Sequence, residues 1–117
     1  MPRWVAPAAL FGVAGVAHFL RPRGFDVIVP RALPGSARAW TLASGVAELG
    51  LAAGYAVPAT RRATSRAAAA FLVAVWPANA QMAVDAWRSG STRARVVTTA
   101  RLPLQVPLVR LALRGGA

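Results

Sequence analysis

The chain has 117 residues, of which 56% are hydrophobic and 15% are charged, and its net charge of +11 comes from fourteen arginines against three acidic residues. A soluble domain carries about 25% charged residues, so we expect a single membrane domain of this length. The chain contains no cysteine, which excludes disulfides, thiolate metal sites and thiol redox chemistry of its own. The arginines fall in clusters between apolar runs, which favours membrane flanking and argues against nucleic acid as a partner.

The first apolar run predicts a helix over residues 4–20. A basic start and the small residues 15–17 also fit a signal peptide, but further apolar runs follow, so we favour an uncleaved first helix. Gly12 and Gly15 allow another helix to approach closely. His18 lies near the end of this run, where a lone histidine is typically hydrogen-bonded to backbone.

Residues 21–38 predict a connector, because three prolines and two glycines interrupt any long helix. The piece Phe25–Val29 is too short to span a bilayer and too apolar for a free loop. We therefore expect a short interfacial or re-entrant segment that caps the bundle between the first two helices. Ser36 or the Pro34–Gly35 turn is expected to start the second helix.

The second helix is predicted over residues 38–57, and Glu48 is the single charge in its apolar part. As a helix, the apolar run 39–57 reaches about 28 Å, close to the thickness of a bilayer core. An ionised side chain at that depth costs about 2.5–3.5 kcal/mol, so it normally has a partner or a function. Thr41, Ser44 and Tyr55 extend one polar stripe along the same face.

The third and fourth helices are predicted over residues 66–87 and 96–113. Pro77 should kink the third helix, and the polar residues 88–95 should form the last connector. Four apolar runs with short connectors predict an all-α fold, an antiparallel four-helix transmembrane bundle formed by one domain over residues 1–117.

Antiparallel connectivity places most of the intramembrane polar side chains in one half of the bilayer, within about 15 Å of the same surface. We predict that six of them line one pocket: His18, Ser44, Glu48, Asn79, Arg101 and Gln105. Arg101 is the expected partner of Glu48, through a direct or water-bridged ion pair. A purely structural polar core is the alternative, although intramembrane ionisable residues are usually functional.

Five motifs in order resemble the DoxX-like (DoxX/DoxD-type) family of small integral membrane proteins. They are Ala17–Pro22, the Pro30 and Leu33–Pro34 connector, Ser44–Glu48, Pro77–Asn79 and Arg101–Gln105. The resemblance covers residues 12–110 and implies a small four-helix membrane protein. The family is associated with subunits of quinol oxidase and thiosulfate–quinone oxidoreductase, and related proteins support methylamine dehydrogenase maturation.

The sequence leaves three functions open. The first is a membrane subunit of a redox or quinone-linked system, whose pocket holds a quinone head group. The second is a binding or carrier module for a small amphipathic or anionic molecule, and the third is a purely structural interaction subunit. No nucleophile–base arrangement indicates an independent enzyme, and one histidine with two methionines makes a poor haem or metal site.

We accordingly expect no covalently bound cofactor and no metal, with quinone as the candidate ligand. The expected surroundings are the lipid bilayer of a bacterial inner membrane, which the chain crosses several times. Candidate protein partners are oxidoreductase subunits or further copies of this chain.

Overall fold

The structure is a computed structural model that describes residues 1–27 and 29–117, and within these ranges it is all-helical, without strands. Four long helices are joined by short connections: α1 (Val5–Leu20), α3 (Ala37–Ala56), α4 (Arg61–Ser89) and α5 (Thr92–Arg114). A five-residue helix, α2 (Pro22–Asp26), follows α1, and a 3-10 turn, η1 (Pro58–Thr60), precedes α4. The predicted all-α class is confirmed.

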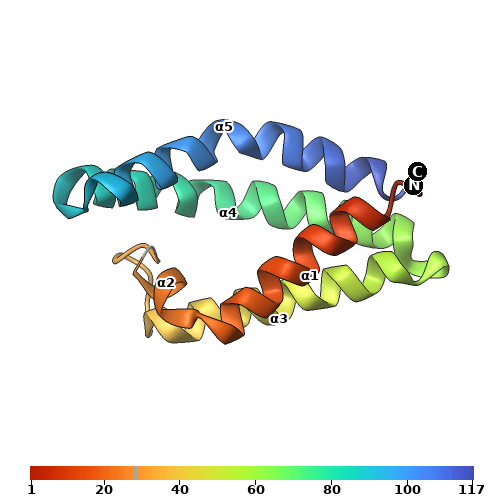
Figure 1. The fold of residues 1–117 in the computed structure, drawn as a ribbon, viewed down its shortest axis with the longest axis horizontal. Coiled ribbons are helices and arrows are strands. Elements are labelled where there is room, and N and C mark those ends of the chain that lie inside the picture. The colour runs from red at the N-terminus through yellow and green to blue at the C-terminus, as the bar shows by residue number, and fades with distance from the viewer. Residues whose placement is uncertain (28) are drawn as a thin grey trace.

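The long helices run alternately in opposite directions and form two pairs (Figure 1). One pair is α1 with α3, and the other is α4 with α5. The pairs meet at the end of the molecule where both termini lie, and they diverge toward the opposite end, where α2 is located (Figure 1). We call these the closed end and the open end.

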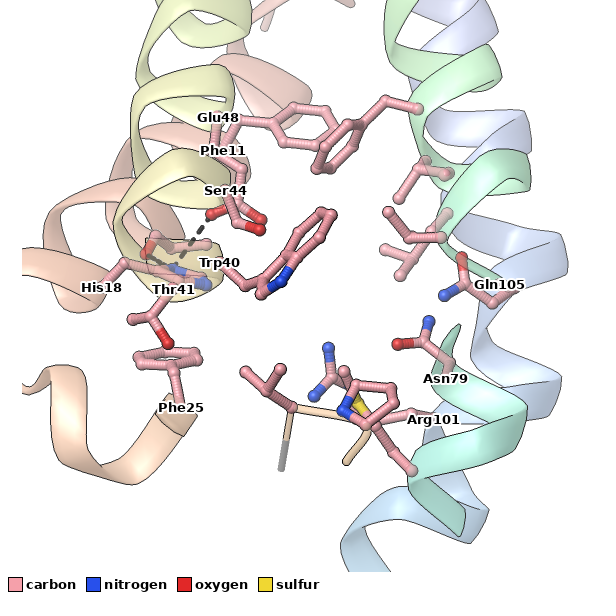
Figure 2. Close-up of a pocket in the computed structure, with 18 of the residues that line it drawn as sticks. Phe11, His18, Phe25, Trp40, Thr41, Ser44, Glu48, Asn79, Arg101 and Gln105 are labelled. Carbon is pink, nitrogen blue, oxygen red and sulfur yellow. Dashed lines mark hydrogen bonds and ion pairs between the residues drawn. The ribbon is translucent and has the colours of Figure 1, made fainter. Parts of the chain in front are cut away.

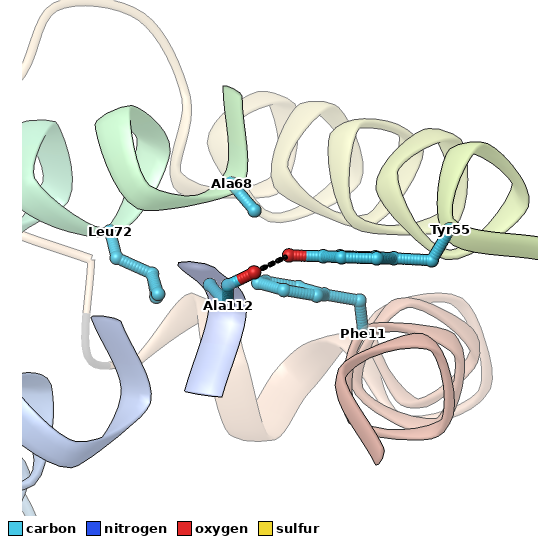
Figure 3. Packing of buried hydrophobic residues seen from close by; sticks show 5 residues of the cluster. All are labelled: Phe11, Tyr55, Ala68, Leu72 and Ala112. Atoms are coloured by element: carbon cyan, nitrogen blue, oxygen red, sulfur yellow. Dashed lines mark hydrogen bonds between the residues drawn. The ribbon is translucent and has the colours of Figure 1, made fainter. Parts of the chain in front are cut away.

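The closed end holds the hydrophobic core of the described residues. The buried side chains of Phe11, Tyr55, Ala68, Leu72 and Ala112 pack together there (Figure 3). The Tyr55 hydroxyl donates a 2.7 Å hydrogen bond to the carbonyl oxygen of Ala112, so the core joins α3 to α5. The two aromatic rings stack with centroids 6.3 Å apart. The core therefore fixes the two helix pairs to each other at one end.

The helix boundaries differ from the predicted ones mainly around α4 and α5. The connector between α4 and α5 was predicted over residues 88–95 but consists of Gly90 and Ser91 only. α5 begins directly after Ser91, because the Ser91 hydroxyl caps it by accepting a 3.1 Å hydrogen bond from the Ala94 backbone N–H. At the other end, α4 already begins at Arg61, where residue 66 was predicted. Pro77 lies inside α4, which continues through it.

The connector between α1 and α3 is partly helical. Ser36 caps α3 as predicted, with its hydroxyl accepting a 3.1 Å hydrogen bond from Ala39 N–H. Phe25 and Val29 are half-buried, but Val27 is 81% exposed, so the segment 25–29 does not cap the bundle with all of its apolar residues. Ile28 lies outside the described residues.

Two segments are long and apolar enough to cross a membrane, Pro58–Ser89 and Thr92–Arg114, and Val5–Leu20 is a shorter apolar helix. In the apolar windows of the two longer segments, 22% and 17% of residues are buried. Most residues of these two apolar windows are therefore not buried within the structure.

Two glycines bring α1 and α3 into close contact. A Cβ atom at Gly45 would lie 2.9 Å from His18 Cβ and 2.8 Å from a ring carbon of Phe19. A Cβ at Gly15 would lie 2.8 Å from Leu49 and 3.1 Å from the Gly45 carbonyl oxygen. The crossing of α1 and α3 thus depends on the absence of side chains at both positions.

We predict that Gly45→Ala lowers the free energy of unfolding by about 1–3 kcal/mol, the usual cost of overpacking a tight contact. His18 Cβ cannot move away without displacing α1. Gly50→Ala is the matched control on the same helix, because nothing lies within 4 Å of its added Cβ. It should be neutral or slightly stabilising, since alanine favours helix. Thermal unfolding in detergent measures both, and equal shifts would contradict this packing.

Candidate functional site

The open end contains a cavity of about 290 Å³ between the two helix pairs. All six residues predicted to line a pocket line this cavity: His18, Ser44, Glu48, Asn79, Arg101 and Gln105. His18, Ser44 and Glu48 belong to the α1/α3 wall, and the other three belong to the α4/α5 wall (Figure 2). Residues that are far apart in the sequence therefore meet across one space.

Glu48 has a different neighbour from the one predicted. Its Oε2 atom lies 3.2 Å from His18 Nδ1, which is the nearest charged or titratable partner described. Within the described residues no direct ion pair joins Glu48 to Arg101, which approaches from the opposite wall (Figure 2), and the water-bridged form of the pair stays a prediction. Both residues line the cavity as predicted, but a position along a helix does not determine the distance across the cavity.

His18 is oriented by its own helix and by α2. Its Nδ1 atom lies 2.6 Å from the carbonyl oxygen of Ala14. A carbonyl only accepts hydrogen bonds, so Nδ1 carries the hydrogen and points it at Ala14. The imidazole ring stacks on Phe25 with centroids 3.8 Å apart and planes 18° apart. The expected backbone hydrogen bond of this histidine is present, and it leaves Glu48 Oε2 without a hydrogen bond to any described residue.

α2 is held against α3 outside the apolar part of the helices. The Arg38 guanidinium donates a 2.9 Å hydrogen bond to Asp26 Oδ2. The pKa of Asp26 lies below its ordinary value, because the Thr41 hydroxyl and then Arg38 stabilise the carboxylate more than burial destabilises it. This ion pair places Phe25 where it can stack on His18.

The α4/α5 wall carries buried polar atoms that find no hydrogen-bond partner among the described residues. The side chains of Asn79 and Gln105 are 3% and 8% exposed, and Asn79 Nδ2 and Gln105 Oε1 have no hydrogen-bond partner among the described residues. The Arg101 guanidinium likewise makes no hydrogen bond or ion pair with any other described residue. Buried polar atoms are nearly always paired, so unpaired atoms around a cavity indicate a bound molecule or water.

Aromatic side chains complete the walls and were missed by the sequence analysis. Phe11, Phe25, Trp40 and Phe71 all line the cavity. Helical spacing contained the signal for three of them. Phe11 lies seven residues before His18, Trp40 lies four residues before Ser44, and Phe71 lies eight residues before Asn79. Phe25 could not be found this way, because it is located on a separate short helix.

The connector closes part of the open end. Val29, Pro30 and Leu33 line the cavity. The Trp40 indole N–H donates a 2.7 Å hydrogen bond to the Pro34 carbonyl, which fixes the connector to α3. A longer contact of 3.4 Å from Arg31 N–H to Asp85 Oδ2 joins it to α4.

We predict that double-mutant cycles will couple Glu48 to His18 more strongly than to Arg101. Removing the 3.2 Å contact with Glu48→Gln and His18→Leu should give a coupling energy between about 0.5 and 3 kcal/mol in thermal unfolding. The cycle of Glu48→Gln with Gln81→Leu is the control, because Gln81 bonds Asp85 outside the cavity. It should be additive within about 0.5 kcal/mol. A larger coupling energy in the cycle of Glu48→Gln with Arg101→Leu would contradict this ranking and support the Glu48–Arg101 pair predicted from the sequence.

Comparison with known proteins gives a family without an assigned activity. No curated protein and no solved structure matches the chain. Residues 8–115 match the profile of a family described as a domain of unknown function, DUF8561. Because the match covers nearly the whole chain and both walls of the cavity, the protein belongs to the DUF8561 family.

Proposed function

We propose that this chain is a multi-pass protein of the cell membrane, a four-span antiparallel bundle whose cavity binds a quinone head group as the membrane subunit of a redox system. The observation that carries the proposal is the cavity itself, where buried and unpaired polar atoms from both helix pairs surround an aromatic space. No metal or covalently attached cofactor is part of this proposal.

The exposed apolar surface supports the membrane part of the proposal. Large apolar side chains such as Val13, Val73 and Val106 are 72%, 62% and 58% exposed, and they come from three different long helices. Soluble monomers rarely expose apolar surface on this scale, whereas lipid acyl chains would cover it. Arginines border the apolar runs, as is typical of residues that extend toward lipid head groups.

The size and chemistry of the cavity support a quinone. A volume of about 290 Å³ is at the small end of ligand sites and suits a ring-sized group better than a whole lipid. Phe11, Trp40 and Phe71 offer flat apolar contacts to a ring, and amide and carboxylate groups on opposite walls can bind its oxygens. Quinones combine these two properties in one small molecule that dissolves in lipid.

The resemblance to DoxX-like proteins supports the same assignment. The motifs contain His18, Glu48, Asn79 and Arg101, and these four residues line the cavity. If the resemblance reflects common ancestry, the motifs mark a ligand site connected with quinone-linked enzymes.

The guanidinium of Arg101 favours a second candidate function, the binding of a small amphipathic anion. Because it has no ion pair among the described residues, it could bind the head group of an amphipathic anion. The chain would then be a carrier or binding module, and fatty acids would compete with quinones for the cavity.

We predict that the two ends of the bundle lie on opposite sides of the membrane. The chain has no cysteine, so Gly24→Cys and Ala117→Cys each introduce a single thiol at an exposed position. A membrane-impermeant maleimide should label these two variants from opposite sides, and carbonate washing should not release the protein.

Val73→Cys is the control, because it lies in the middle of α4 and should face lipid. It should resist the water-soluble reagent in intact membranes and react after denaturation. Labelling of Gly24→Cys and Ala117→Cys from the same side would rule out the four-span arrangement.

We predict that 2-methyl-1,4-naphthoquinone binds the purified protein and quenches the fluorescence of Trp40, which lines the cavity. Saturation at a hundred times Kd should stabilise the fold by about 2.7 kcal/mol. Asn79→Leu removes one hydrogen-bond donor and should weaken binding about three- to tenfold.

Two variants control for unspecific effects in this binding experiment. Trp40→Phe should remove most of the quenching but keep part of the thermal stabilisation, because phenylalanine still offers a ring to the ligand. Gln81→Leu should bind normally because Gln81 does not line the cavity. Displacement by a fatty acid but no binding of the quinone would favour the anion carrier. The absence of any ligand effect would leave the polar core a purely structural feature.

A further inference from the structure

We infer that the cavity binds the reduced, hydroquinone form of its ligand more tightly than the oxidised quinone, and that Glu48 is the residue that discriminates between them. The inference rests on the proposed function, because it assumes a quinone-type ligand. It concerns the Glu48 carboxylate, whose two oxygens offer only acceptors to the cavity when the group is ionised.

The carboxylate oxygen Oε2 of Glu48 is buried and has no hydrogen bond within the described residues. His18 Nδ1 lies 3.2 Å away, but its N–H points at the Ala14 carbonyl oxygen 2.6 Å from it. The inference concerns the ionised form of Glu48, because a carboxylate accepts hydrogen bonds and donates none, whereas the neutral acid could donate. A molecule that satisfies Glu48 in this cavity must therefore present an O–H or N–H group.

The opposite wall does not discriminate in this way. Asn79 and Gln105 each carry an amide, which offers both a donor and an acceptor, and Arg101 offers donors. An amide can turn its NH₂ toward a carbonyl oxygen or its oxygen toward a hydroxyl. This wall can therefore bind the ligand oxygen that lies away from Glu48, whether that oxygen is a carbonyl or a hydroxyl.

The two redox forms differ in the property that Glu48 requires. Both oxygens of a quinone are carbonyl acceptors. If one of them lay at Glu48, two acceptors would face each other and no hydrogen bond could form between them. The hydroxyl of a hydroquinone donates to Glu48 and can still accept from a neighbour. A charge-assisted hydrogen bond of this kind is stronger than a neutral one, and it is available only to the reduced form.

The experiment compares the two forms on the full-length protein in detergent without oxygen. We expect dithionite-reduced 2-methyl-1,4-naphthoquinone to bind at least about tenfold tighter than the oxidised form, measured by equilibrium dialysis. Tenfold preference for the reduced form raises the midpoint potential of the bound two-electron couple by about 30 mV relative to the free couple. The potential is an independent measurement of the same quantity.

Two variants separate the roles of the two walls. Glu48→Gln replaces the carboxylate by an amide that can also donate, so the preference should fall to less than about threefold while the quinone binds at least as well as before. Asn79→Leu should weaken both forms by a similar factor and leave their ratio unchanged. Thermal unfolding without ligand checks that both variants remain folded.

A change in the ligand tests the inference on the unaltered protein, in case Glu48→Gln does not fold. The dimethyl ether of the hydroquinone keeps the ring and both oxygens but has no O–H group. It should bind no more tightly than the quinone, and tight binding of this ether would overturn the role of the donated hydrogen bond.

The remaining outcomes distinguish this inference from the proposed function. Equal binding of the oxidised and reduced forms would overturn the inference and leave the quinone site intact. A preference that persists in Glu48→Gln would overturn the assignment to Glu48. Binding of neither form would overturn the proposed function, and the inference with it.

Discussion

The arrangement of the whole molecule depends on the contact between Tyr55 and α5. The Tyr55 side chain is fully buried, and its hydroxyl bonds the Ala112 carbonyl at 2.7 Å, so one side chain supplies both apolar packing and a polar link. Gly115 allows this closeness, because a Cβ there would lie 2.7 Å from the tyrosine ring. The pairs are thus fixed tightly at one end. The cavity follows from this geometry, since straight helices joined at one end diverge at the other.

A polar cavity between diverging helices is costly unless something occupies it. Leaving a buried donor or acceptor unpaired costs about 1–3 kcal/mol, and Glu48, Asn79 and Gln105 each carry such an atom. Polar contacts that only hold membrane helices together average about 0.6 kcal/mol, and neutral side chains suffice for them. A structural role would favour groups that pair with one another. The observed groups instead face a common space, which favours a ligand over structural support.

The sequence predicted which residues share the cavity but not how they pair. Counting 1.5 Å per residue along alternating helices placed His18, Glu48 and Arg101 in the same half of the membrane, and all three line the cavity. The direct contact between Glu48 and His18 was not predicted, because the distance between side chains of two helices depends on how closely those helices pack. Gly15 and Gly45 bring α1 against α3, which puts His18 beside Glu48. How closely two helices pack depends on contacts between residues far apart in the sequence, which helical periodicity does not give.

The helix ends and the short helix α2 show a second limit of the sequence. Arginine-rich stretches were assigned to connectors on polarity, yet α4 begins at Arg61 and α5 at Thr92. A polar residue can continue a helix beyond an apolar span, so polarity alone marks the end of the span and not the end of the helix. Phe25 was expected to cover the bundle and does line the cavity, but its stacking on His18 was not predicted, because the sequence does not place a separate short helix relative to the long ones.

These contacts form a chain that leads from an exposed ion pair to the buried carboxylate. Arg38 holds Asp26 and thereby α2 against α3, and α2 carries Phe25 to the face of His18. Stacking limits rotation of the imidazole, so its Nδ1 hydrogen stays directed at the Ala14 carbonyl. A histidine free to turn could donate this hydrogen to Glu48 and satisfy it internally. The connector therefore does more than close the open end: by restraining His18, it keeps the Glu48 oxygen available to a molecule in the cavity.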